Sequence, residues 1–147
     1  MEQLGQLIAF YREHIGQYRA QSYNETEVRS DFVNPFFELL GWDVANRKRL
    51  PQHLREVKQE ASVFVEEDGV RKKKKPDYAF YFGSQTCFFL ETKKPSVDIV
   101  TSREAAFQLR RYGWNGNLRI SVLTNFTDLL IYDCTVRPRQ EDDVFTA

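Results

Sequence analysis

Cysteine, methionine and long apolar runs are scarce in this chain, and charges of the two signs balance. The 147 residues include only 2 Cys and 1 Met, and Cys87 and Cys134 show neither metal-binding CxxC spacing nor a disulfide framework. We therefore expect two buried thiols in a reducing compartment. Lys plus Arg and Asp plus Glu both total 21, so the zero net charge gives no global argument for a polyanionic partner. Any case for nucleic acid must rest on local features.

No segment approaches the roughly 20 consecutive apolar residues that cross a bilayer. The first residues carry charge within their apolar stretch and lack a small-residue cleavage site, so we expect a soluble protein without a secretory signal. The 41% hydrophobic and 14% aromatic content argues against disorder, and the length predicts a single domain over residues 1–147. The tail EDDVFTA ends without a structural stop, which suggests a fragment of a longer chain.

Two helices are predicted before the first strand. Residues 2–19 repeat apolar side chains at helical spacing, which is typical of an amphipathic helix. Over residues 24–40, an Asn cap, acids in the first turn and an apolar face predict a second helix, which Gly41 should end. Pro35 should bend this helix or split it, because proline removes a backbone hydrogen bond.

The rest of the chain predicts strands with one helix among them. Alternating or aromatic-rich runs predict strands at residues 42–44, 61–67, 77–82, 86–93, 119–125 and 129–134. The Asp68-Gly69 pair favours a tight turn, so the strands from residue 61 to 93 should form a meander. A helix over residues 101–112 should begin at Ser102 and stop at Gly113. The expected fold class is α/β (α+β), a mixed central β-sheet flanked by helices.

Three charged residues near the middle of the chain form the candidate catalytic site. Glu91 and Lys93 lie two apart on one predicted strand, so they project from the same face, together with Cys87 and Phe89. A hairpin should bring Asp77 alongside them. Two adjacent carboxylates repel each other, and Mg²⁺, which prefers oxygen ligands and retains waters, would relieve that repulsion. Lys93 would orient or deprotonate a water, or stabilise charge on a phosphate.

The alternative is an ordinary surface ion pair between Glu91 and Lys93, with Asp77 merely starting a strand. Such pairs are common and contribute roughly 0 to 1 kcal/mol. Against this interpretation, the apolar run CFFL directly precedes Glu91, and charged residues beside such a run are more often functional than solvated. Spacing alone does not decide between the two.

The stretch from Pro76 to Lys93 resembles the PD-(D/E)xK nuclease superfamily, with Pro76-Asp77, 13 intervening residues, and Glu91-Thr92-Lys93. More narrowly, the chain is similar to the N-terminal endonuclease domain of restriction-modification enzymes. These are the single-chain type IIG kind that also methylates, or the motor subunits of type I systems. The matching stretches NETEVRSDFVNPFFELLGWDV, FQLRRYGWN and SVLTNFTDLLIYD bring the resemblance to most of residues 24–133. It implies a restriction-endonuclease-like fold.

The resemblance adds three residues to the site. NETEVRSDFVNPFFELLGWDV looks like the family's leading helix, whose glutamate assists the metal site. Glu25 is our choice for this accessory acid, and Glu27 is the rival. FQLRRYGWN is similar to the family's QxxxY motif, so Gln108 and Tyr112, four apart on one helix face, should lie near the active site and DNA.

The resemblance implies a Mg²⁺-dependent endodeoxyribonuclease, with Mn²⁺ as a substitute, that hydrolyses double-stranded DNA. Asp77, Glu91 and Glu25 would hold the metal, and Lys93 would position the attacking water. Target choice would belong to methyltransferase and target-recognition modules, or to a motor, in the same longer chain or complex. The setting implied is the cytoplasm of a bacterium or archaeon, with dimerisation as one route to double-strand cleavage.

A basic run, RKKKK, leads directly into the candidate site. We predict that cations of this run and of the third helix contact DNA phosphates, which would make binding salt-dependent. They are Lys73, Lys74, Lys75, Arg110 and Arg111. The alternative is a solvated hairpin rim, which charge runs usually are.

The competing function is a nuclease-like domain that binds DNA or a partner protein without cutting. A degenerate domain would commonly have lost Lys93 or one carboxylate, whereas all three residues are present here. With zero net charge and no recognisable base-reading element, the domain should bind DNA weakly and without sequence preference by itself.

Overall fold

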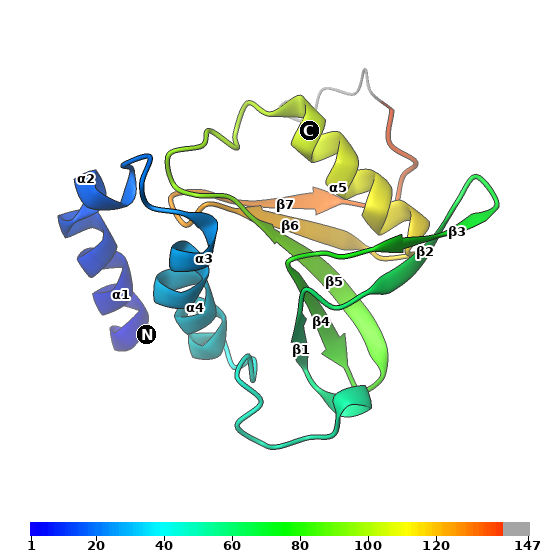
Figure 1. Ribbon diagram of the computed structural model, residues 1–147, viewed down its shortest axis with the longest axis horizontal. Helices are drawn as coiled ribbons and strands as arrows, with labels where there is room; N and C mark the ends of the chain where they lie inside the picture. Colours follow the sequence, from blue (N-terminus) through cyan, green and yellow to red (C-terminus); the bar gives the residue numbers. More distant parts are fainter. Residues whose placement is uncertain (140–147) are drawn as a thin grey trace.

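A five-stranded mixed sheet forms the centre of the computed structural model, which describes residues 1–139 (Figure 1). The strand order is β1-β4-β5-β6-β7, and a separate two-stranded sheet holds β2 and β3. The N-terminal helices cover one face of the large sheet, and α5 covers the other. The predicted mixed sheet flanked by helices is confirmed. None of the helices in this described part of the chain has the length and apolarity to cross a membrane.

The N-terminal helices are more broken than the sequence predicts. The first predicted helix is two, α1 (Glu2–Glu13) and α2 (Ile15–Tyr18), because the chain leaves helical geometry at His14, whose φ is −113°. The second begins at Asn24 in a capping box and runs through α3 (Glu25–Val28), a π-helical segment η1 (Arg29–Val33) and α4 (Asn34–Leu39).

Pro35 interrupts the α-helical hydrogen-bond pattern of the second helix, although the backbone keeps helical φ and ψ at Val33 and Asn34. Its missing N–H and its ring fit the first turn of α4, and the π-helical turn directly before it absorbs the interruption. Gly41 follows the end of α4 with φ of +104°, a conformation that favours glycine, so the predicted stop is confirmed.

Strand pairing in the large sheet is antiparallel except between β5 and β6. The strands are β1 (Val57–Gln59), β4 (Tyr78–Phe82), β5 (Gln85–Thr92), β6 (Ile120–Thr124) and β7 (Leu129–Asp133). The helix α5 (Arg103–Asn115) connects the two parallel strands, as a crossover must. Tyr78, Phe80 and Leu90 pack with the N-terminal helices, whereas Ala79 and Phe89 pack on the opposite face.

The predicted strand at residues 42–44 is wrong. Residues 42–56 form turns and one short 3-10 helix, η2 (Gln52–Leu54), and the first strand is β1. The Asp43 carboxylate accepts backbone N–H groups from Arg47 at 2.7 Å and Lys48 at 3.0 Å. This carboxylate closes a turn where the apolar pattern predicted a strand, because Asp readily bonds nearby backbone groups.

The predicted meander is also wrong. β2 (Val63–Glu67) and β3 (Val70–Lys74) pair only with each other, and β1 takes the place beside β4. The turn at Asp68-Gly69 is confirmed, with φ of +52° and +76°. β3 is the most polar of these strands and has no fully buried residue, so it gains nothing from a place inside the large sheet.

Gly113 does not stop the third predicted helix. Ser102 caps α5 as predicted, its hydroxyl accepting the Ala105 N–H at 3.4 Å, but the helix continues to Asn115 and is followed by Gly116. Gly113 is buried against β6 and the residue after β7. A Cβ there would lie 2.8 Å from Ser121 Oγ and would overlap Cys134. This glycine allows close contact between helix and sheet.

Candidate functional site

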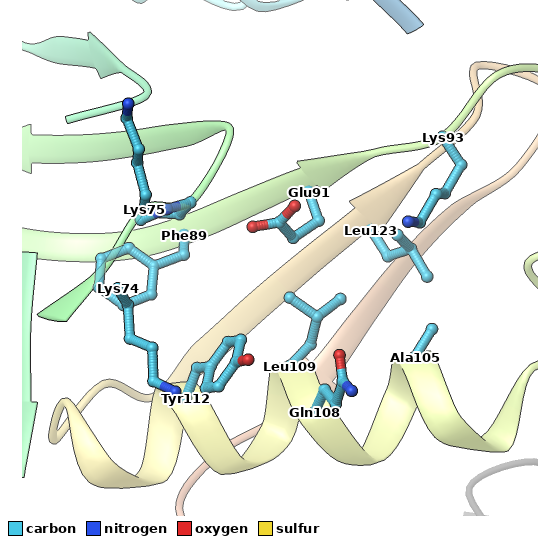
Figure 2. A pocket seen from close by; sticks show the side chains of 11 residues that line it. Lys74, Lys75, Phe89, Glu91, Lys93, Ala105, Gln108, Leu109, Tyr112 and Leu123 are labelled. Carbon is cyan, nitrogen blue, oxygen red and sulfur yellow. The ribbon is translucent and has the colours of Figure 1, made fainter. Parts of the chain in front are cut away.

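A pocket of about 270 Å³ lies between β5 and α5 (Figure 2). The β5 strand and its extension contribute Phe89, Glu91 and Lys93, as the predicted alternation requires. Gln108 and Tyr112 line the opposite wall from one face of α5. The structure therefore brings four of the six predicted catalytic residues into one pocket.

Asp77 lies directly before β4 and directly after Pro76, which lines the pocket. Its backbone N–H points to Glu91 Oε1 at 3.3 Å, so the expected closeness of the two acids is confirmed. Its side chain turns toward the next residue of β5, where Thr92 donates its N–H at 2.7 Å and its hydroxyl at 2.8 Å to Asp77 Oδ2. The Asp77 carboxylate is therefore firmly placed at the end of the sheet.

The pKa of Glu91 is raised from its ordinary value of 4.5 to about 8, chiefly by burial. The negative charge of Asp77 and a hydrogen bond between the two side chains contribute to this rise, while the Asp77 N–H and the charge of Lys93 act in the opposite direction. Two carboxylates pressed together in a half-buried place are costly to ionise. Such perturbed groups cluster at functional sites.

Arg29 is part of this site, although no pattern in the sequence predicts a role for it. Its Nη2 lies 2.8 Å from Asp77 Oδ1 and its Nε donates to Thr92 Oγ1 at 2.8 Å. The side chain is only 15% exposed. Its position one turn after Glu25 could have indicated their ion pair, but no sequence pattern points to Asp77 or Thr92 as partners. Thr92, between Glu91 and Lys93 in the sequence, was missed in the same way.

The two rival accessory acids occupy different surroundings. Glu27 Oε2 accepts the Asn24 N–H at 2.8 Å and completes the capping box of α3. Glu25 turns to Arg29, with its Oε2 3.7 Å from the same Nη2 that binds Asp77. Glu25 is therefore connected to the site through Arg29, whereas Glu27 caps the N-terminal end of α3.

The predicted DNA-binding cations separate into two groups. Lys74 and Lys75 line the pocket, and Lys74 Nζ lies 4.5 Å above the centre of the Tyr112 ring. Arg111 joins them near that ring, 5.7 Å from its centre. Lys73 projects from the other face of β3, opposite Phe64.

Arg110 lies away from the pocket, close to β7. The pKa of Asp133 is lowered by hydrogen bonds from Thr135 and, more weakly, by the charge of Arg110.

A buried carboxylate organises the cations near Tyr112. Glu67, 7% exposed, lies 3.6 Å from Lys72 and Lys74 and 3.4 Å from Arg111. This cluster joins the β2–β3 hairpin to α5, and so fixes the basic side of the pocket.

The acids of the site suit a hard divalent cation. Among residues 1–139, no three His, Cys, Asp or Glu side chains gather closely enough to form a metal site of their own. The pair Asp77 and Glu91 nevertheless fits the coordination that Mg²⁺ prefers, which is one or two carboxylates with water and phosphate oxygens as the other ligands. The raised pKa of Glu91 has burial as its main cause and the charge of Asp77 as its second, and a cation between the two acids would offset that repulsion.

The fold and the pocket define a mixed α/β domain with two acids and a lysine at one end of its sheet. The chain is 45% identical, over 97% of its length, to the Type II restriction enzyme and methyltransferase RM.Eco57I of Escherichia coli. The matched region is 14% of that protein's length. No family model matches the chain, and no solved structure matches it.

Proposed function

We propose that this chain is the Mg²⁺-dependent endonuclease region of a restriction-modification enzyme, and that it hydrolyses phosphodiester bonds of DNA. The similarity to RM.Eco57I, which extends over nearly the whole chain, supports a restriction-modification role. The PD-(D/E)xK resemblance and the restriction-endonuclease-like fold remain part of this proposal. The name of the relative covers two activities, DNA cleavage by a restriction enzyme and methyl transfer. The chemistry of the pocket in this chain is the basis for choosing between them.

One observation supports nuclease chemistry most strongly: Asp77 lies against Glu91, and Glu91 lines a pocket together with Lys93. Methyl transfer has no evident use for two mutually repelling acids. Hydrolysis of a phosphodiester does, because a cation held between acids can offset the charge of the phosphate.

Each candidate catalytic side chain has a proposed role. Asp77 and Glu91 would bind Mg²⁺, or Mn²⁺ in its place, and Glu25 would assist them. A bound divalent cation would supply positive charge to the phosphate under attack. Lys93, on the same strand face as Glu91, would hold the water or stabilise charge on the phosphate.

The opposite wall would bind the DNA backbone. Gln108 can donate and accept hydrogen bonds, and the Tyr112 ring lies beneath the Lys74 ammonium. Lys74, Lys75 and Arg111 would contact phosphates there. Target recognition and methylation, or a motor, would belong to other modules of the same chain or complex. We place the enzyme in the cytoplasm, and propose dimerisation as one route to double-strand cleavage.

The test is cleavage of plasmid DNA in Mg²⁺ or Mn²⁺, by this chain and by a longer chain that contains it. Lys93→Ala should lower the cleavage rate by at least about a hundredfold. Arg103→Ala is the control, because Arg103 is exposed at the start of α5 and lies outside the pocket. Undiminished cleavage by Lys93→Ala would contradict the proposed role of Lys93.

A second function, DNA or protein binding without cleavage, rests on one observation. Both oxygens of Asp77 already accept hydrogen bonds from Arg29 and Thr92, as they would in a site that needs no metal. A parent chain that binds DNA but cuts under no metal condition, alone or in the longer chain, would favour this alternative.

A further inference from the structure

The Arg29 side chain lies at the position where a cation could join two acids of the site. Its Nη2 is 2.8 Å from Asp77 Oδ1 and 3.7 Å from Glu25 Oε2. Asp77 is 16% exposed on its side chain and Glu25 40%, so the Asp77 contact is the better shielded of the two. The same nitrogen, Nη2, therefore faces two carboxylates: Asp77, directly before β4, and Glu25 in α3.

The remaining nitrogens of Arg29 hold the guanidinium in a fixed plane. Nε donates to Thr92 Oγ1 at 2.8 Å, and Nη1 lies 3.4 Å from Glu60 Oε1. Thr92 in turn donates to Asp77 Oδ2. Arginine, threonine and aspartate thus form a closed hydrogen-bonded ring, and Asp77 keeps its place without any ligand.

Arg29 is also the first residue of the π-helical segment, which ends at Val33, two residues before Pro35. A π-helical turn in an otherwise α-helical stretch is frequent at functional sites. The backbone irregularity and the buried guanidinium therefore occur at the same residue.

We propose that Arg29 is an exchangeable counter-cation of the metal site. Without metal, its guanidinium neutralises Asp77 and links it to Glu25; when a divalent cation binds, Nη2 leaves Asp77 Oδ1 and that oxygen binds the metal instead. Thr92 remains bound to Asp77 Oδ2 and keeps the carboxylate in position. Arg29 is a positioning residue, and this role rests on the proposed metal-dependent function.

The exchange makes a prediction about binding that needs no cleavage assay. Since Arg29 competes with the metal for Asp77, Arg29→Gln should bind Mn²⁺ about tenfold more tightly than the parent, as measured by calorimetry without DNA. Arg29→Lys retains a positive charge near Asp77 but loses the guanidinium bonds to Thr92 and Glu60, so its Mn²⁺ affinity should lie between those of the parent and Arg29→Gln. Arg47→Gln is the matched control, because Arg47 is 77% exposed and pairs with Glu38, at 3.5 Å, on the surface.

Thermal unfolding provides a second measurement through linkage. In EDTA, Arg29→Gln should unfold at a lower temperature than the parent, because Asp77 loses a buried partner. In saturating Mn²⁺ the gap between the two should narrow, since the metal replaces the lost charge. A crystal structure of the parent with Mn²⁺ should show Nη2 beyond hydrogen-bond distance from Asp77 Oδ1.

Three results would overturn the proposal: equal or weaker Mn²⁺ binding by Arg29→Gln, a temperature gap that stays constant, or an intact Arg29–Asp77 contact in the metal-bound structure. The last result needs no variant and applies even if Arg29→Gln fails to fold. Failure of the parent to bind Mn²⁺ at all would contradict the proposed function as well. Binding by the parent without a change in the variant would contradict the exchange alone.

Discussion

Glu91 shows how strongly a single side chain can depend on its surroundings. Phe89 and Leu90 anchor its strand on both faces of the sheet, and burial is the main reason for the raised pKa of Glu91. Asp77 donates its N–H to this carboxylate and faces it with a charge. The site therefore contains a carboxylate that prefers a proton or a cation to remaining as a bare ion.

This preference should appear as a pH dependence of stability. The pKa of Glu91 is raised in the folded chain, so its contribution is complete below the unfolded pKa and is lost as pH rises toward about 8. In EDTA, the free energy of unfolding should fall between pH 5 and 8 by up to about 1.4 kcal/mol per pH unit. Glu91→Gln should remove most of that slope in urea titrations. An equal slope in the variant would show that Glu91 ionises at its ordinary pKa.

The rival acids of α3 can be separated by a matched pair of substitutions. Glu25→Gln should weaken Mn²⁺ binding and slow cleavage by about tenfold, because supporting residues of metal sites have effects of this size. Glu27→Gln removes the same charge from the same turn but can retain the capping hydrogen bond to Asn24. We expect it to leave both quantities unchanged. The reverse result would make Glu27 the accessory acid.

At the scale of elements, the position of α5 determines the shape of the pocket. Gly113 lets the helix approach the sheet, because a side chain there would overlap Cys134 and Ser121. Gly113→Ala should therefore cost about 1 to 3 kcal/mol and displace the wall formed by Gln108 and Tyr112. Urea unfolding measures the cost, and DNA affinity should fall with it.

Gly5 is the control for this substitution. It lies within α1, where a Cβ would meet nothing within 4 Å. Gly5→Ala should stabilise the chain by about 0.5 to 1 kcal/mol, since alanine favours helix over glycine. If both alanines had the same effect, close packing at Gly113 would not be its reason.

Helix starts, the helix interruption and the tight turn were predicted well, because each depends on one residue and its immediate neighbours. Asn24, Pro35, Asp68-Gly69 and Ser102 act through their own backbone or side-chain bonds, and each was predicted correctly. Pairing between strands was harder. β1 has three residues and no alternation long enough to detect, so its place beside β4 could not be read from the sequence.

The site residues that follow local spacing were also predicted, and those that depend on long-range packing were not. Strand alternation predicted that Glu91 and Lys93 share a face, and helical spacing predicted the same for Gln108 and Tyr112. Arg29 could not be placed, because its partners lie 48 and 63 positions away in the chain. Only the packed N-terminal helices bring it to the end of β5.

For the whole molecule, zero net charge limits how DNA can bind. The cations near the pocket must supply the attraction, since the remaining surface offers no excess. With 1 mM EDTA to prevent cleavage, affinity for a duplex should fall steeply with salt and differ little between duplexes of unrelated sequence. Strong preference for one duplex would show that this chain reads bases by itself.

Single substitutions should show how much each lysine contributes to the salt dependence of DNA binding. Lys74→Gln and Lys75→Gln should each lower the slope of log affinity against log salt by about 1, as expected for the loss of one phosphate contact. Lys73 projects from the opposite face of β3, so Lys73→Gln tests whether DNA also reaches the outer side of the hairpin. Lys48→Gln is the control, because Lys48 pairs with Glu56 at 2.7 Å and does not line the pocket. A slope unchanged by the Lys74 and Lys75 substitutions would mean that the duplex does not bind along this pocket. That result would contradict the proposal that Glu91 and Lys93 act on a DNA phosphate there.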